Sequence, residues 1–182
     1  MKKWLVTDTH FNHENIRNGK LSSVRPMDYQ DQIINNWKSM VGADDTVYHM
    51  GDVIFARRWE LKDIIHDLPG IKILIRGNHD LYDIGSKKKN INPDPDFYID
   101  AGFIAVVEAI MERNFILLSH APVMLSPDIK LNIHGHFHDN PQRHWEPWYQ
   151  DIIAKGKCRH RLLACEYEDY KPVLLEDFVR RG

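Results

Sequence analysis

Residues 71–80 of the chain read IKILIRGNHD. The first half of this stretch is mainly apolar and β-branched, which predicts a buried strand, and the glycine and polar residues that follow predict a turn at its carboxyl end. Trp4–Thr7 is a similar run and is followed by Asp8-Thr9-His10. Thr46–Met50 is another and is followed by Gly51-Asp52. We therefore expect three strands that each end in polar side chains.

Two helices are predicted between these strands. Apolar residues recur at helical spacing in Met27–Met40 and in Trp59–Leu68, and the second run stops before Pro69-Gly70. The first half of the chain is then β-α-β-α-β, an order that favours a largely parallel sheet. In such a sheet, ligands bind at the carboxyl ends of the strands.

The second half is predicted to be mostly β. Phe103–Met111 and Phe115–Ser119 read as two strands joined by a tight polar turn. Further short strand candidates are Leu131–Ile133, Leu162–Cys165 and Val173–Leu175. Tyr82–Asp100 carries turn formers and separated charges, so it is predicted to be a long surface loop. Because domains usually hold roughly 100 to 200 residues, we expect one mixed α/β domain with two sheets over residues 1–182.

The composition is that of an ordinary globular protein. Hydrophobic residues make up 43% and charged residues 27%, which argues against a disordered, collagen-like or coiled-coil chain. The formal net charge of -2 supplies no global basic field, so a nucleic-acid partner is not indicated. Two cysteines, Cys158 and Cys165, are too few for a disulfide framework, and there is no signal-peptide core or long apolar span. We expect a cytoplasmic chain without a membrane partner, and nothing in the sequence sets an oligomeric state.

Eleven histidines stand out in the composition, and several lie with carboxylates at predicted strand ends. The candidate metal ligands are Asp8, His10, Asp52, Asn78, His120, His136 and His138. The pairs Asp8/His10 and His136/His138 are spaced i, i+2, which points both side chains of a pair to one side of extended backbone. A lone Gly-Asp or Asp-x-His usually marks a turn or a satisfied polar group. Five such segments, each at a strand end, favour a metal site.

The donor types indicate the kind of metal. Carboxylate oxygen and imidazole nitrogen suit divalent ions such as manganese, and the absence of thiolate disfavours a structural zinc site. Seven ligands exceed what one tetrahedral ion takes. Two ions that share Asp52 would use all seven, with Asp8, His10 and His138 on one ion and Asn78, His120 and His136 on the other. Manganese is the leading expectation, although Fe, Zn, Ni or Co accept the same donors. Only two of the seven ligands are carboxylates, so such a centre would stay positive and attract phosphate oxygens.

The order Asp-x-His, Gly-Asp, Gly-Asn-His-Asp, His, Gly-His-x-His resembles that of the calcineurin-like metallophosphoesterases, over Asp8–His138. The opening run Asp8–Ile16 is most similar to that of the short bacterial and phage members. The resemblance implies a four-layer α/β/β/α sandwich with two mixed β-sheets, a binuclear centre on the strand-end loops and the ligand split given above. It also implies that His79 donates a proton or stabilises the transition state, and Asp80 would orient it. Val53-Ile54-Phe55 departs from the pattern of the protein phosphatases, which argues against that activity.

These features predict a metal-dependent phosphoric ester hydrolase. A hydroxide held between two ions would attack the phosphoryl group in line. The substrate would be a small-molecule or nucleotide phosphoester, and a phosphodiester is favoured. One alternative is a nuclease or cyclic-nucleotide phosphodiesterase, which the net charge mildly disfavours. The other is a catalytically inactive protein-binding scaffold of the same fold, which the complete ligand set and His79 disfavour.

Four other residues are candidates for substrate contact or for support of the ligands. Asn12, His13 and Arg17 lie just beyond the first motif and can meet the substrate. The alternative for Asn12 is a helix N-cap, and for Arg17 it is a solvated surface position. His134 shares strand parity with His136 and would either support a ligand or act as an ordinary polar residue.

Overall fold

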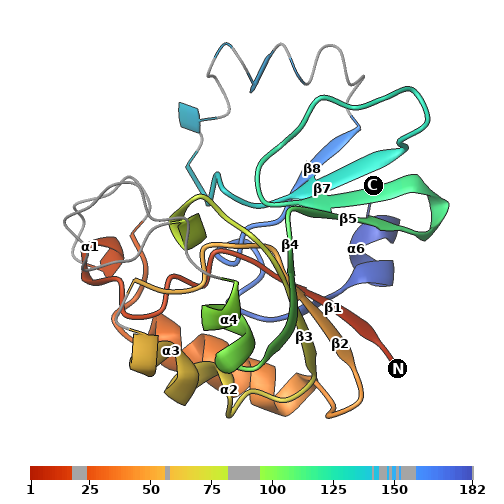
Figure 1. Ribbon diagram of the computed structural model, residues 1–182. Helices are drawn as coiled ribbons and strands as arrows, with labels where there is room; N and C mark the ends of the chain where they lie inside the picture. The colour runs from red at the N-terminus through yellow and green to blue at the C-terminus, as the bar shows by residue number, and fades with distance from the viewer. Residues whose placement is uncertain are drawn as a thin grey trace.

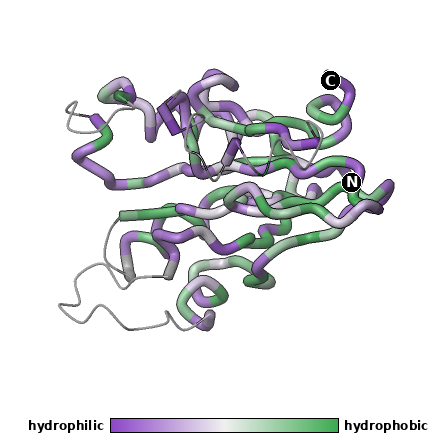
Figure 2. The backbone as a smooth tube through the Cα atoms, turned by 90° about the horizontal axis from the view of Figure 1, so that it is seen from above, coloured by the Kyte–Doolittle hydropathy of each residue, from purple (hydrophilic) through white to green (hydrophobic). Residues whose placement is uncertain are grey.

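The computed structural model describes residues 1–17, 24–55, 58–81, 95–140, 142–143, 147, 149–150, 152 and 159–181. Two β-sheets are stacked on each other, and helices cover the outer face of the first sheet (Figure 1). Seen from above, the stacked sheets form two layers (Figure 2). The predicted mixed α/β domain with two sheets is confirmed at this level.

The first sheet has the strand order β4-β3-β2-β1-β9. Its strands are β1 (Lys3–Val6), β2 (Thr46–His49), β3 (Ile71–Ile75), β4 (Phe103–Val107) and β9 (Val173–Leu174). The first four run parallel, with Val6 opposite His49 and His49 opposite Leu74, whereas β9 is antiparallel to β1. The parallel core of this sheet confirms the β-α-β-α-β prediction and brings three strand ends to one edge.

The second sheet has the strand order β5-β6-β7-β8. It consists of β5 (Ala109–Glu112), β6 (Ile116–Ser119), β7 (Leu131–His134) and β8 (His160–Leu162). The β5–β6 pair is antiparallel around the short 3-10 turn η2 (Arg113–Phe115), and the other two pairs are parallel. Because β7 follows β6 in parallel, the carboxyl ends of these two strands also share one edge.

The helices of the first layer are explained by their apolar faces. The helix α2 (Tyr29–Met40) buries Tyr29, Ile33 and Trp37, and α3 (Arg58–Ile65) buries Leu61 and Ile65. Together with α4 (Asp96–Asp100) they lie on one face of the first sheet (Figure 1). None of the described helices is both long and apolar enough to cross a membrane.

Alternation along the strands divides the apolar residues between two cores. On β1, Trp4 and Val6 pack toward the helices, whereas Leu5 packs toward the second sheet. The core between the sheets includes Leu118, Ile133 and Phe178. Phe178 belongs to α6 (Leu175–Arg180), which contacts β1 and β9. The central strand β1 is therefore buried on both faces, as expected for a strand in a sheet between two layers.

Three predicted elements differ from the structure. Phe103–Met111 was predicted as one strand, but it forms β4 and β5, which separate at Glu108 and belong to different sheets. The run is apolar on both sides of Glu108 because Phe103 enters the core under the helices and Ile110 the core between the sheets. Periodicity therefore cannot show where the chain crosses. The predicted strand Leu162–Cys165 is only partly right, since β8 ends at Leu162, and predicted Val173–Leu175 joins the first sheet as β9.

The predicted loop Tyr82–Asp100 is wrong at its end, where α4 forms against β4. Residues 82–94 of that loop lie outside the described part of the chain, as does Cys158, while Cys165 is a buried free thiol. The short helix α1 (Glu14–Arg17) follows the first motif. Between β7 and β8, Tyr149 has helical backbone, and its ring packs edge-on against His134.

His49 is a buried neutral group in the core under the helices. The Thr9 hydroxyl donates to the Val53 carbonyl and therefore accepts from the His49 Nε2–H, 2.9 Å away. Protonation would place a charged N–H at Nδ1, which has no partner within the described residues. Burial therefore lowers the pKa of His49 to about 4.

We expect this residue to make the unfolding free energy fall on acidification. The unfolded chain takes up the proton near pH 6.5 and the folded chain only near pH 4, so metal-free protein should lose about 3 kcal/mol at His49 across that window. Urea unfolding between pH 7.5 and 4.5 measures this loss. His49→Gln should reduce the loss over this pH range by about that amount, and exposed His66→Gln should leave it unchanged. Equal pH dependence in wild type and His49→Gln would contradict the assignment.

Candidate metal centre

Five strand-end loops meet at the edge where β1, β2, β3, β6 and β7 end. Backbone hydrogen bonds join neighbouring loops, from Asp8 N to Gly51 O at 2.9 Å and from His10 N to Asp52 O at 3.0 Å. A third backbone hydrogen bond, from Gly135 N to His120 O at 2.8 Å, joins the loops after β7 and β6. These bonds continue the parallel ladders past the strands and place the polar side chains of separate motifs in one region.

All seven predicted ligands come together there, in two groups that could each hold a metal ion. In the first group, His10 Nε2 lies 3.2 Å from His138 Nε2, and Asp8 Oδ1 lies 4.0 Å and 3.8 Å from these two atoms. Donor atoms bound at about 2.1 Å to one ion lie about 3 to 3.5 Å apart. The spacing of this group is therefore close to what one ion requires.

The second group contains Asp52, His120 and His136. His120 Nε2 lies 3.1 Å from His136 Nδ1 and 2.9 Å from the amide oxygen of Asn78. Asp52 Oδ2 lies 3.5 Å from His120 Nε2 and also 3.7 Å from His10 Nε2 in the first group. One oxygen of one carboxylate thus faces both groups.

The hydrogen-bond partners of two histidines leave the ring nitrogen that faces its group free to bind metal. His120 Nδ1 lies 2.8 Å from the Met50 carbonyl, to which it must donate, so Nε2 keeps its lone pair. His138 Nδ1 lies 3.1 Å from Glu166 Oε1, which has the same effect on its Nε2. In addition, Asp8 Oδ1 is buried and has no hydrogen-bond partner in the described part of the chain. These donors fit a cation.

Backbone strain is concentrated in the same residues. Left-handed backbone with positive φ is uncommon outside glycine and costs about 1 to 3 kcal/mol per residue. Five of the seven predicted ligands adopt it: Asp8, His10, Asp52, His136 and His138. Packing and hydrogen bonds elsewhere must hold these residues in place, a pattern typical of functional sites.

The charges of the site are also compatible with a bound cation. Burial, together with the neighbouring carboxylates Asp8 and Asp80, raises the pKa of Asp52 to about 9. Burial lowers the pKa of His136 to about 4, which keeps its ring neutral as a ligand must be. A divalent ion would displace the proton from Asp52 and relieve the repulsion between the carboxylates.

Arg25 and Glu166 support the first group, and the sequence analysis missed both. The Arg25 guanidinium donates to the Asp8 carbonyl at 2.7 Å and the Thr9 carbonyl at 3.0 Å, and it pairs with Glu166 at 2.7 Å. Burial alone would raise the pKa of Glu166, but the His138 hydrogen bond and the Arg25 charge hold it well below its usual range. Neither residue belongs to a motif, and they are 141 positions apart. No local pattern could have revealed them.

Asp80 has hydrogen-bond partners that the sequence did not predict. It was expected to orient His79, but its carboxylate accepts from the backbone N–H groups of Asp52, Val53 and Gly77, at 2.8, 3.0 and 2.8 Å. The Tyr98 hydroxyl is a fourth donor, at 3.1 Å. Asp80 is buried and ties the loop after β2 to the loop after β3. These bonds hold the backbone of the candidate ligand Asp52 in place.

The four residues predicted to meet substrate or support ligands have different surroundings. Asn12 is not seen capping a helix, since its side chain donates to Glu60 at 2.8 Å. His13 stacks in parallel on Phe55, with ring centroids 3.8 Å apart. Arg17 is half-buried in α1 and, among the described residues, has no recorded contact with a predicted ligand. His134 bonds the Gly135 carbonyl and Tyr149, so it acts as an ordinary buried polar residue.

A cleft of about 350 Å³ opens over both groups. Its lining includes His10, His136 and His138 from the groups, with His13, His79 and Arg143 around them. The His79 side chain is 42% exposed, and its Nε2 lies 4.0 Å from Asp52 Oδ2. His79 therefore faces solvent beside the shared carboxylate and is available to a ligand in the cleft.

Gly135 allows the loop after β7 to approach the first group closely. A Cβ atom there would overlap the Thr7 hydroxyl and Asp8 Oδ2. We therefore expect Gly135→Ala to displace Asp8 and weaken Mn²⁺ binding by about 10- to 100-fold, the usual cost of disturbing groups that orient ligands. Calorimetric titration with Mn²⁺ measures this, and Gly42→Ala, whose Cβ has room, is the matched control. Unchanged affinity in Gly135→Ala would contradict the expectation.

The fold and the site define an α/β protein with two stacked sheets and two groups of His and Asp residues that could each hold a metal ion. The chain belongs to the family of the uncharacterized protein MJ1445 of Methanocaldococcus jannaschii, to which it is 32% identical over 189 residues, covering 98% of this chain and 90% of that protein. The gene 66 protein of Mycobacterium phage L5 is 33% identical over 85 residues, covering 42% of this chain and 39% of that protein.

Among solved structures, the chain is similar to the protein of unknown function AQ665 from Aquifex aeolicus. The TM-score is 0.70 at 26% sequence identity, and the match covers 100% of this chain and 99% of the other. No family model matches the chain.

Proposed function

We propose that the protein is a phosphoric ester hydrolase that uses two divalent metal ions, with manganese as the first candidate. The observation that carries this proposal is the position of Asp52 Oδ2 within 3.7 Å of His10 Nε2 and 3.5 Å of His120 Nε2. A shared carboxylate between two sets of neutral nitrogen donors is what a binuclear centre requires. The resemblance of the sequence motifs to those of the calcineurin-like metallophosphoesterases agrees with it.

Two divalent ions in such a centre would act as Lewis acids toward phosphoryl oxygens and lower the pKa of a water molecule. The chain's own residues determine the charge of the site. Asp8 and Asp52 are the only carboxylates among the seven ligands, so about two positive charges would remain uncompensated. Phosphoesters are anions of matching charge, and the cleft over both groups gives them access.

His79 is proposed as the residue that acts on the substrate directly. It is exposed to the cleft beside Asp52, and it does not belong to either group of donors. From there, its imidazole can donate a proton to the leaving oxygen or a hydrogen bond to the phosphoryl group.

We expect His79→Ala to bind Mn²⁺ as wild type does but to lose about 10²- to 10⁴-fold in turnover, the usual contribution of a positioned acid. Turnover and Mn²⁺ titration on the same preparation measure both properties. His66→Ala, at an exposed position just after α3, is the control for loss of a histidine. Wild-type turnover in His79→Ala would remove His79 from the mechanism.

The proposed function is tested by the hydrolysis of a chromogenic phosphodiester beside the matching monoester, on metal-stripped protein titrated with Mn²⁺. Metal-dependent hydrolysis of either ester supports the proposal, and faster diester cleavage supports the phosphodiesterase form, which includes a nuclease or a cyclic-nucleotide phosphodiesterase. A protein that binds Mn²⁺ but hydrolyses neither ester would favour the inactive scaffold. A cytoplasmic site of action belongs to the same proposal.

A further inference from the structure

Arg143 is a half-buried arginine in the cleft, and it is not part of any motif. Its Nη1 lies 3.2 Å from His136 Nε2. Three other half-buried or buried arginines have partners outside the cleft: Arg25 pairs with Glu166, Arg76 pairs with Glu108, and Arg161 donates to backbone carbonyls of α6. In the described part of the chain, Arg143 has no carboxylate partner.

His136 connects Arg143 to the second group of donors. Nδ1 of its ring faces His120, and Nε2 faces Arg143. The His136 ring therefore separates the Arg143 guanidinium from the metal-binding atoms of the second group. An arginine can only donate hydrogen bonds. When Nδ1 of His136 is a metal ligand, Nε2 carries the ring proton and also only donates. Arg143 then needs another acceptor, and the cleft is where its side chain lies.

We propose that Arg143 binds a phosphoryl oxygen of the substrate, which makes it a specificity-determining residue for dianionic phosphoryl groups. This inference rests on the proposed function of the same site. The planar fork of a guanidinium matches two phosphoryl oxygens, and a fixed positive charge favours the dianion of a monoester over the monoanion of a diester. Inorganic phosphate, the product shared by all monoester substrates, should bind to the same group.

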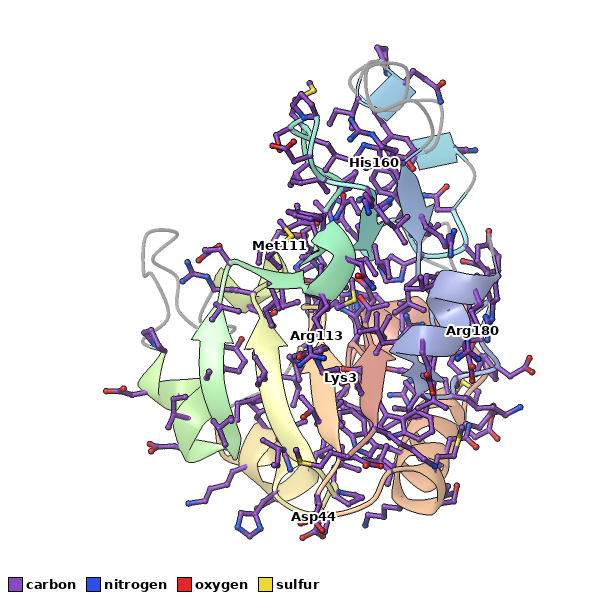
Figure 3. The ribbon with its side chains drawn as sticks, turned by 90° about the vertical axis from the view of Figure 1, so that its right-hand side faces the viewer. Lys3, Asp44, Met111, Arg113, His160 and Arg180 are labelled. Carbon is purple, nitrogen blue, oxygen red and sulfur yellow. The ribbon has the colours of Figure 1, made fainter. Side chains whose placement is uncertain are left out.

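The experiment measures the binding of inorganic phosphate to Mn²⁺-loaded protein by calorimetry, with Mn²⁺ binding titrated separately. Arg143→Gln removes the charge, and Arg143→Lys keeps the charge but not the fork. Arg113→Gln is the matched control, because Arg113 is exposed beside Lys3 and lines a different cavity (Figure 3). We expect Arg143→Gln to weaken phosphate binding by about 10- to 100-fold, Arg143→Lys to fall between it and wild type, and Mn²⁺ affinity to change by less than about threefold.

A second measurement tests the charge preference. At a pH above the second pKa of the monoester, near 6, Arg143→Gln should lower kcat/KM for the monoester more than for the diester. Equal phosphate affinity in wild type and Arg143→Gln would overturn the inference, while metal-dependent hydrolysis in the same preparations would leave the proposed function standing. If wild type binds neither Mn²⁺ nor phosphate, the proposed function fails and this inference fails with it.

Discussion

Asp52→Asn should abolish metal-dependent hydrolysis, with a loss of at least about 10³-fold in kcat/KM. The substitution keeps the shape of the side chain but replaces its charge by a neutral amide. Because Asp52 Oδ2 faces both His10 Nε2 and His120 Nε2, the change removes negative charge from both proposed ion sites at once. Calorimetric titration should show fewer bound Mn²⁺ ions per chain than in wild type.

The control for this variant is Asp44→Asn. Asp44 is exposed in the turn before β2, at the end of the sheet opposite the strand-end loops (Figure 3). The Asp44→Asn variant should bind Mn²⁺ and hydrolyse esters as wild type does. The stability of metal-free Asp52→Asn should not fall at neutral pH, because burial and the neighbouring Asp8 and Asp80 raise the pKa of Asp52 to about 9 and its side chain is already neutral there. Full activity in Asp52→Asn would contradict the shared-carboxylate centre.

Arg25→Met should lower the unfolding free energy by about 3 to 5 kcal/mol. That is the typical effect of removing one partner from a buried ion pair, since it leaves the other charge buried without compensation. Both side chains are almost fully buried, with 0% of Arg25 and 5% of Glu166 exposed. The carbonyl groups of Asp8 and Thr9 lose their donors as well. Urea unfolding at pH 7.5 in the absence of metal measures the loss.

The double variant Arg25→Met/Glu166→Met separates charge from packing. Replacing both partners with apolar side chains removes the isolated charge, so most of the lost stability should return. The Mn²⁺ affinity of the double variant should still be about 10- to 100-fold weaker than that of wild type. The reason is that His138 has lost the carboxylate of Glu166, which orients its ring. A single variant that loses less than about 1 kcal/mol would show that Arg25 is not a structural residue of this site.

Local sequence predicts two kinds of element: strands that are apolar on both faces, and helices whose apolar residues recur with the helical period. The helix α2 and the strands β1, β2 and β3 were predicted within a few residues for this reason. The division of Phe103–Met111 between two sheets was not, because an apolar run has the same period whichever core it enters. Similarly, β9 could not be assigned to the first sheet, since two residues carry no information about their pairing.

At the candidate site, the sequence by itself identified the seven candidate ligands. Each one follows a strand end, and the parallel order of the strands brings such ends together. Only the tertiary structure decided the contacts of Asp80, Arg25 and Glu166 and placed Arg143 in the cleft. Their roles depend on which backbone groups, rings and charges lie within about 3 Å of a side chain. Those neighbours come from loops far apart in the chain, so no spacing within the sequence encodes them.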